Sequence, residues 1–185
     1  SFQQSFLDRP TNFQEILDGR VKTLHPLIYG GILARREIPE HVTTMKDHGI
    51  VAVDLVCVNL YDFASVVASS DSSEEEILEN IDIGGPTLIR AAAKNFKSVL
   101  PVVDPADYDE VISKLRLGTV NFDYRKGLAR KAFELVSEYD GIIESYLAGK
   151  STDPTVFPET LSITYKKVDD LRYGENPHQA AALYG

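Results

Sequence analysis

Residues 20–23, Arg-Val-Lys-Thr, form the first group in the chain whose residue types could do chemistry. The surrounding stretch has neither helical nor strand periodicity, so a loop is expected there. The Arg20 guanidinium could hold a phosphate or a carboxamide through two parallel hydrogen bonds, and Lys22 could carry a proton. A solvent-exposed basic loop is the competing interpretation, and the pattern alone leaves both open.

A second group surrounds the start of a predicted helix. Gly84 and Gly85 precede a proline suited to a first helical turn, and their backbone N–H groups could bind an anion. Asp82 could cap this helix or accept a hydrogen bond from a ligand amide. Arg90 and Lys94 are four residues apart and share a helix face. Two like charges there indicate either an anion between them or two independent surface cations.

Asn59 and Tyr61 follow an apolar run, residues 50–58, that predicts a strand covered on both faces. A second buried strand is predicted at residues 98–103. Because strands alternate with helices, we expect an α/β domain with a parallel sheet. Ligands in such domains bind beyond the carboxyl ends of the strands, so Asn59 and Tyr61 are expected where chemistry would occur.

Caps and apolar periodicity indicate the helices that must position these groups. We expect a short helix from a capping box at residues 11–14 to Gly19, and further helices at 39–47, after Ser73, at 84–94, from Asp104 onward and at 122–147. The proline-containing segment 150–158 predicts a linker, and 161–168 predicts one more strand. The expected domains are therefore residues 1–149 and the beginning of another at 150–185.

The composition argues against several classes of protein. Nineteen Lys and Arg residues against 28 Asp and Glu give a net charge of −9, which disfavours a broad nucleic-acid surface. The single Cys57 excludes an internal disulfide framework, and His41 and His48 lack metal-ligand spacing. His25 is expected to be a packed, hydrogen-bonded side chain before a catalytic one. No run approaches the ~20 apolar residues of a membrane span, and no secretory leader is visible, so a cytoplasmic protein is expected.

Several sequence motifs, separated along the chain, together indicate a family. The segments GRVKTLHP, GGILARR, VNLYDF, ENIDIGGPTLIRAAAKN, VVDPADY and LRYGENPHQ occur in one order along the chain. Together they closely resemble the inosine monophosphate (IMP) cyclohydrolase domain of the bifunctional purine biosynthesis protein that also carries AICAR transformylase. The resemblance implies a methylglyoxal-synthase-like, three-layer α/β domain with a mostly parallel sheet. It also implies ring closure of 5-formamidoimidazole-4-carboxamide ribotide (FAICAR) to IMP with loss of water.

The same resemblance assigns roles to individual residues. Lys94 matches the family's proposed proton donor and acceptor, and Lys22, Tyr61 and Asp82 would be catalytic with it. The residues expected to bind the nucleotide are Arg20, Val21, Lys22, Thr23, Val58, Asn59, Asp82, Ile83, Gly84, Gly85 and Arg90. Were Lys22 and Lys94 to lie together, each would lower the other's proton affinity and make acid–base chemistry easier.

Both ends of the chain differ from the family pattern. The strand–helix–strand segment that usually comes first, with its phosphate loop, is not found in these residues. Arg172 and Tyr173 would bind AICAR in a transformylase domain, which uses 10-formyltetrahydrofolate. The cyclohydrolase itself would need no metal or organic cofactor. The resemblance also implies a homodimer with FAICAR and IMP as ligands, and no nucleic-acid or membrane partner.

Substitutions within the motifs mark further departures. Asp62 stands where the family usually has proline, and Leu27 and Tyr29 stand where it often has lysine and histidine. A non-catalytic nucleotide-sensing module of the same fold is the main alternative, because such a module would bind an anionic nucleotide without needing the two lysines and Tyr61. Methylglyoxal synthase is a third possibility.

Overall fold

The computed structural model describes residue 11, residues 16–149, residue 160 and residues 163–185. The chain divides into two compact units, Ser1–Leu147 and Ala148–Gly185, which are treated separately below. Residues 12–15 of the expected first helix and the whole expected linker at 150–158 lie outside the described residues. None of the helices in the described part of the chain is long and apolar enough to span a membrane.

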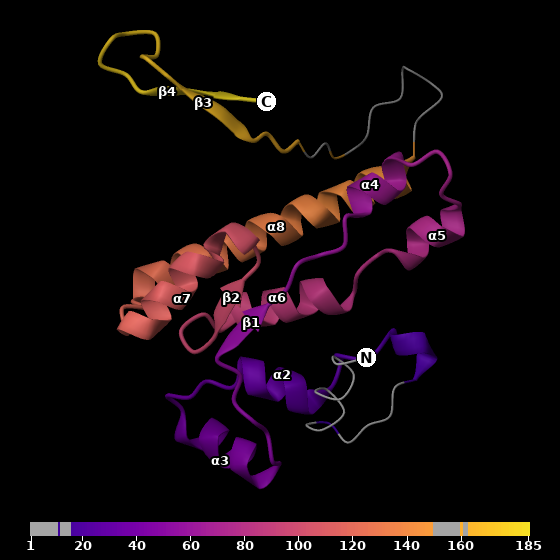
Figure 1. Cartoon of the computed structure of the whole chain (residues 1–185), viewed down its shortest axis with the longest axis vertical. Coiled ribbons are helices and arrows are strands. Elements are labelled where there is room, and N and C mark those ends of the chain that lie inside the picture. The colour runs from indigo at the N-terminus through magenta and orange to yellow at the C-terminus, as the bar shows by residue number, and fades with distance from the viewer. Residues whose placement is uncertain (1–10, 12–15, 150–159, 161–162) are drawn as a thin grey trace. The chain divides into compact units, whose positions relative to one another are not determined.

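The first unit alternates short strands with helices, as the sequence pattern predicts (Figure 1). Its helices are α2 (Pro26–Leu33), α3 (Pro39–Asp47), α4 (Phe63–Ala68), α5 (Glu74–Glu79), α6 (Gly84–Lys94), α7 (Tyr108–Leu117) and α8 (Phe122–Ala148), and its strands are β1 (Leu55–Cys57) and β2 (Leu100–Val102). Short 3-10 turns occupy Leu17–Gly19 and Pro105–Asp107. The α/β class with a parallel sheet is confirmed.

Strands β1 and β2 pair in parallel, with Val56 opposite Pro101 at the centre of the register. All three residues of β2 are buried, whereas in β1 only Val56 is buried. The prediction that residues 50–58 form a strand covered on both faces was therefore wrong. The regular strand is three residues long, and its two outer side chains, Leu55 and Cys57, are exposed. Apolar composition indicated burial on both faces, but the described residues cover only one side of β1.

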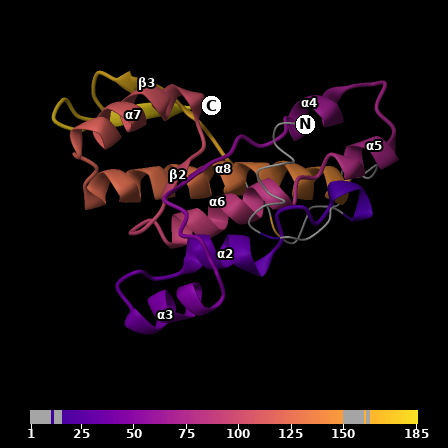
Figure 2. The same ribbon diagram turned by 60° about the horizontal axis from the view of Figure 1, so that its bottom comes forward.

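Helix α6 is the last of the three helices between β1 and β2, and it lies between α2 and α8 in both views (Figures 1 and 2). Ile89 and Ala93 of α6 belong to one buried cluster with Ala132 and Val136 of α8. These side chains pack α6 against α8. Full burial of an aliphatic side chain such as Ile89 stabilises the fold by about 1.5–3 kcal/mol. This packing fixes α6, whose first residues belong to the candidate site.

The far part of α8 carries a second cluster, made with α4 and α5. Phe63 is 1% exposed and contacts Tyr139 and Tyr146 edge-on, with ring centroids 6.1 and 6.0 Å away. Ile77 of α5 belongs to the same cluster. Edge-to-face contacts of this kind stabilise beyond the area they bury. They hold the segment between α5 and α6 against α8, and that segment contains Asp82.

The predicted helix starts are confirmed where local chemistry sets them. Pro39 opens α3, and Ser73 and Glu76 form the capping box of α5, each side chain bonding the other's backbone N–H. The sequence analysis missed α2. His25 is its N-cap, with Nδ1 accepting a hydrogen bond from the Leu27 N–H at 3.1 Å, and Pro26 is its first residue. The His-Pro pair was the available signal, because proline is favoured at the first helical position.

The second unit contains an antiparallel pair, β3 (Lys167–Leu171) and β4 (Ala181–Tyr184). The further strand was predicted at residues 161–168, so it begins and ends later than expected. Pairing decides these bounds, because Lys167 lies opposite Tyr184 and Leu171 opposite Ala181.

Candidate functional site

Asp82 organises the start of α6. Its Oδ1 accepts a hydrogen bond from the Gly85 N–H at 2.9 Å, and its own N–H donates to the hydroxyl oxygen of Tyr139 at 2.7 Å. Burial raises the pKa of Tyr139, so this hydroxyl stays protonated at neutral pH. Of the two roles proposed for Asp82, the structure shows capping: its side chain accepts from the first turn of α6, although Ile83 is the N-cap residue. Among the described residues no hydrogen bond is made to Oδ2.

The loop at residues 20–23 lies against the same helix end. A Cβ atom on Gly84 would lie 2.7 Å from the Thr23 Oγ1, and one on Gly85 would lie 2.4 Å from the Asp82 Oδ2. Both positions therefore require glycine for close packing, one against the loop and the other against Asp82. The structure thus brings together Thr23, Gly84, Gly85 and Asp82, which are up to 62 residues apart in sequence.

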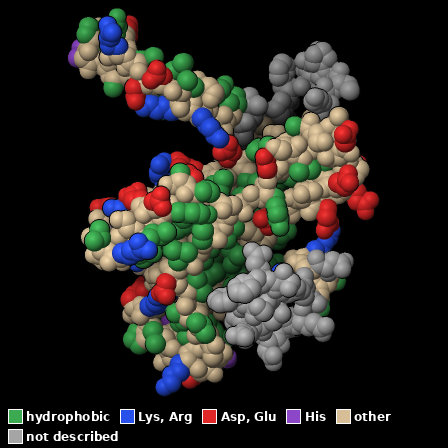
Figure 3. Space-filling view, in the orientation of Figure 1, with side chains coloured by type: hydrophobic (Ala, Val, Ile, Leu, Met, Phe, Trp, Pro, Cys, Tyr) green, Lys and Arg blue, Asp and Glu red, His purple; other side chains and the backbone are tan. Residues whose placement is uncertain are grey.

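Arg20 is held by an exposed ion pair with Glu79. Its Nε lies 3.3 Å from Glu79 Oε1, a second contact joins its terminal nitrogen to Oε2, and the two side chains are 68% and 57% exposed. Pairs this exposed contribute about 0–1 kcal/mol, so Arg20 can exchange Glu79 for a phosphate at small cost. Figure 3 shows acidic side chains gathered over α5, the helix that carries Glu79. Lys22 is exposed, and Val21 is half-buried.

Asn59 is held at the carboxyl ends of the strands. Its Nδ2 donates to the Val103 carbonyl at 3.0 Å, and its Oδ1 accepts from the Tyr108 hydroxyl at 3.0 Å. Both ends of the amide are therefore engaged in joining β1 to β2 and α7. Val58, half-buried, packs against the clusters of α6. Tyr61, two residues beyond Asn59, is 69% exposed.

Two of the departures from the family pattern have structural roles. Asp62 is the N-cap of α4, with Oδ1 accepting from the Ser65 N–H at 3.1 Å, so it starts a helix directly after Tyr61. The Tyr29 hydroxyl donates to Thr87 Oγ1 at 2.9 Å and joins α2 to α6. Burial raises the pKa of Tyr29, which keeps this donor protonated.

Lys94 and Arg90 lie away from the loop at residues 20–23. Lys94 is the last residue of α6, ten residues beyond Gly84 and therefore about 15 Å along the helix axis. The Arg90 guanidinium lies over the ring of Phe133 on α8, 5.6 Å from its centroid. Lys22 belongs to the loop that packs on Gly84, whereas Lys94 is the last residue of α6. The expected convergence of the two lysines is therefore not seen within one chain. Ile83, which directly precedes the first residue of α6, is exposed.

The turn after β2 is tied to α8 by an ion cluster. Lys131 Nζ lies 2.6 Å from Asp104 Oδ2 and 2.9 Å from Asp107 Oδ2. The Asp104 carboxylate accepts a hydrogen bond from Lys131, which has the larger effect, and another from the Ala106 N–H. Together they hold the pKa of Asp104 below its ordinary value of 3.8. A depressed folded pKa means that this stabilisation is present above the unfolded pKa and is lost as pH falls through the folded value.

We therefore expect Asp104→Asn to lower the urea midpoint of unfolding at pH 7 and to have a smaller effect near pH 3. Asparagine retains an oxygen that can accept from Ala106 but cannot pair with Lys131 as an ion. Midpoints measured by circular dichroism across this range check the expectation. Asp140→Asn, on an exposed position of α8, is the matched control. If the urea midpoints of Asp104→Asn and the unsubstituted chain differ by the same amount at every pH, the expected role of the Asp104 charge is contradicted.

Arg172 and Tyr173 belong to the second unit and are exposed directly after β3. In the described part of the chain, no three His, Cys, Asp or Glu residues are grouped so as to hold a metal ion. The sequence analysis also missed a pocket of about 690 Å³ at the amino ends of β1 and β2, whose wall includes Arg36, Lys97 and Arg125. These cations come from three separate segments, so no sequence motif joins them.

The α/β fold and the glycine-rich helix start match a known class of domain. A model of the MGS-like domain matches residues 3–87. A model of the AICARFT/IMPCHase bienzyme matches residues 92–185, just over half of the chain. The chain therefore belongs to the AICARFT/IMPCHase bienzyme family, as its motifs predicted.

Individual relatives agree with this assignment. The chain is 53% identical over 178 residues to the bifunctional purine biosynthesis protein PurH of Leuconostoc mesenteroides, covering 96% of this chain and 34% of that protein. It is also 53% identical to PurH of Acidithiobacillus ferrooxidans over 178 residues, with 94% and 34% covered. The crystal structure of ForH superposes with a TM-score of 0.68 at 35% identity, covering 77% of this chain and 73% of that one. The chain spans about a third of the length of the curated relatives it matches.

Proposed function

We propose that this chain carries the ring-closing activity of the family and converts FAICAR to IMP in purine biosynthesis. The observation that supports this best is the packing of Thr23 against Gly84, which sets Arg20 and Lys22 beside the start of α6. A helix N-terminus with two nearby cations suits the phosphate of a nucleotide. The protein would act in the cytoplasm as a homodimer.

The proposed chemistry needs no external nucleophile. The carboxamide nitrogen of FAICAR attacks the formyl carbon of the same molecule, forming the ring C–N bond, and the former formyl oxygen leaves as water. Holding the two groups in this geometry is the first contribution of the site. The second is proton transfer from nitrogen to the departing oxygen, for which Lys22 is the proposed carrier beside the start of α6. Lys94 lies about 15 Å along that helix, so the proposal requires the second copy in the homodimer to supply it. No metal or organic cofactor enters this proposal, and 10-formyltetrahydrofolate would serve only formyl transfer.

The Asp82 side chain suits the carboxamide. Its Oδ1 is engaged with the Gly85 N–H, while Oδ2 is available to accept from a ligand N–H. A carboxamide bound there would be held in one rotamer, with its nitrogen turned toward the formyl group. Tyr61 is exposed and could donate to the oxyanion that forms as the carbonyl is attacked.

A nucleotide-sensing module without catalysis is the second candidate. The separation of Lys94 from the loop at residues 20–23 favours it, because a sensor needs the anion site but no second lysine. The two candidates differ in whether a bound nucleotide is transformed.

Incubating the chain with FAICAR while following the ultraviolet absorbance of IMP tests the proposal. PurH of Leuconostoc mesenteroides is the positive control, and calorimetry with IMP measures binding in parallel. We expect IMP to form and to bind. IMP binding without IMP formation would overturn ring closure and support the sensor, and failure of both would overturn both candidates.

A further inference from the structure

We propose that the pocket at the amino ends of β1 and β2 is a second binding site, which takes a small phosphate ester. The pocket has a volume of about 690 Å³, within the range of ordinary small-molecule sites. Its wall includes Asp54, just before β1, and Ser98 and Leu100, at the start of β2. The Asn59 and Asp104 turns lie at the opposite ends of these strands, so the pocket is separate from the proposed nucleotide site.

Two cations in the pocket wall have no close ion pair among the described residues. Glu37 is paired with Arg35 at 2.9 Å, and Asp54 is paired with Arg36. Lys97 and Arg125 make no close ion pair with any described residue, although the charge of Lys97 acts on Glu37 at longer range. In a chain with a net charge of −9, Arg125 without an ion pair and Lys97 opposed only at longer range favour an anionic ligand.

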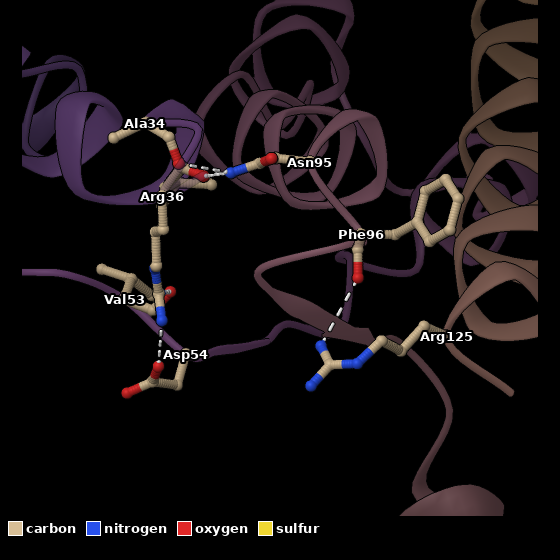
Figure 4. A network of polar contacts seen from close by, with 8 residues as sticks. Ala34, Arg36, Val53, Asp54, Asn95, Phe96 and Arg125 are labelled. Carbon is tan, nitrogen blue, oxygen red and sulfur yellow. Dashed lines mark hydrogen bonds and ion pairs between the residues drawn. The ribbon is translucent and has the colours of Figure 1, made fainter. Parts of the chain in front are cut away.

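Arg125 is arranged to bind an oxyanion. One terminal nitrogen donates a long hydrogen bond, 3.4 Å, to the carbonyl of Phe96, which orients the guanidinium and leaves most of its N–H groups uncommitted. Figure 4 shows the Arg125 guanidinium, from α8, beside the Phe96 carbonyl and the Arg36 guanidinium, from the chain after α2, beside Asp54. Both arginines line the pocket. A planar fork of this kind binds phosphate through two parallel hydrogen bonds.

Arg36 supplies an independent observation. Its terminal nitrogens contact Asp54 and the Val53 carbonyl, but its Nε is buried and has no acceptor among the described residues. An unsatisfied buried N–H costs about 1–3 kcal/mol in a protein interior. Because this Nε is closed off from solvent, a phosphate oxygen would supply the missing acceptor only with a shift of the Arg36 side chain.

The rest of the pocket selects the class of phosphate compound. Ser98 adds a hydroxyl group, and Leu100 and Leu115 add apolar surface beside the cations. An inorganic ion would leave this apolar surface in water. The combination therefore fits a phosphate monoester whose organic part lies on the two leucines.

Titration of the ¹⁵N-labelled chain with phenyl phosphate tests the site, since this probe carries both a phosphate and an apolar group. We expect the amide signals of Lys97 and Ser98 to shift, and inorganic phosphate to bind several-fold more weakly. Lys97→Ala should weaken phenyl phosphate binding about tenfold, because Lys97 is exposed and its loss removes a charge without removing buried packing. Arg125→Gln should weaken it at least as much.

Lys126→Ala, an exposed cation next to Arg125 on α8 but outside the pocket wall, is the matched control and should bind normally. Lys22→Ala should also bind normally, which separates this site from the proposed nucleotide site. Absence of binding, equal affinity in Lys97→Ala, or shifts confined to residues around Gly84 would each overturn the proposal.

Discussion

Replacing Gly31 by alanine is expected to lower the free energy of unfolding by about 3 kcal/mol, near the upper end for overpacking in a core. Gly31 is buried in α2, and a Cβ atom there would lie 2.2 Å from the carbonyl oxygen of Val51. A backbone carbonyl cannot rotate away as the end of a flexible side chain can. The Val53 N–H also donates to the Gly31 carbonyl at 3.1 Å, so the added methyl group would displace both segments. Urea denaturation followed by circular dichroism measures the loss.

Gly127→Ala is the matched control for this substitution. Gly127 lies within α8, and nothing would lie within 4 Å of its added Cβ atom. Alanine loses less backbone entropy than glycine on helix formation, so this variant should gain about 0.5–1 kcal/mol. Equal stability of the two variants would contradict the close packing of α2 against the segment before β1.

The second large effect is expected at Lys94. In the FAICAR assay, Lys94→Ala should slow ring closure about 10²- to 10⁴-fold, the usual cost of removing a general acid or base. Lys94 is exposed, so the thermal midpoint of unfolding should stay unchanged. IMP binding should also be retained, because Lys94 lies at the end of α6 opposite the loop at residues 20–23.

Rates from ultraviolet absorbance and affinities from calorimetry separate these effects. Lys46→Ala, an exposed lysine near the end of α3, is the matched control and should change neither quantity. An unchanged rate in Lys94→Ala would remove Lys94 from the mechanism. A loss of IMP affinity as large as the loss of rate would make it a binding residue.

Tertiary packing decided the features that the sequence analysis misjudged. The apolar run at residues 50–58 became a three-residue strand with Leu55 and Cys57 exposed, because apolar composition does not show which faces other elements cover. Arg90, expected near the nucleotide, lies over Phe133 of α8. The pocket of Arg36, Lys97 and Arg125 had no signal in the sequence, since its three cations come from separate segments.

The sequence by itself determined the family, the α/β class and the starts of α3, α5 and α6. Capping residues such as Ser73 act on backbone groups three residues away, so their effect is visible in a short window of sequence. The tertiary structure alone decided that Thr23 packs on Gly84 while Lys94 lies at the other end of α6. Distances between segments far apart in the chain depend on how helices pack around a shared core, and no local pattern encodes that packing.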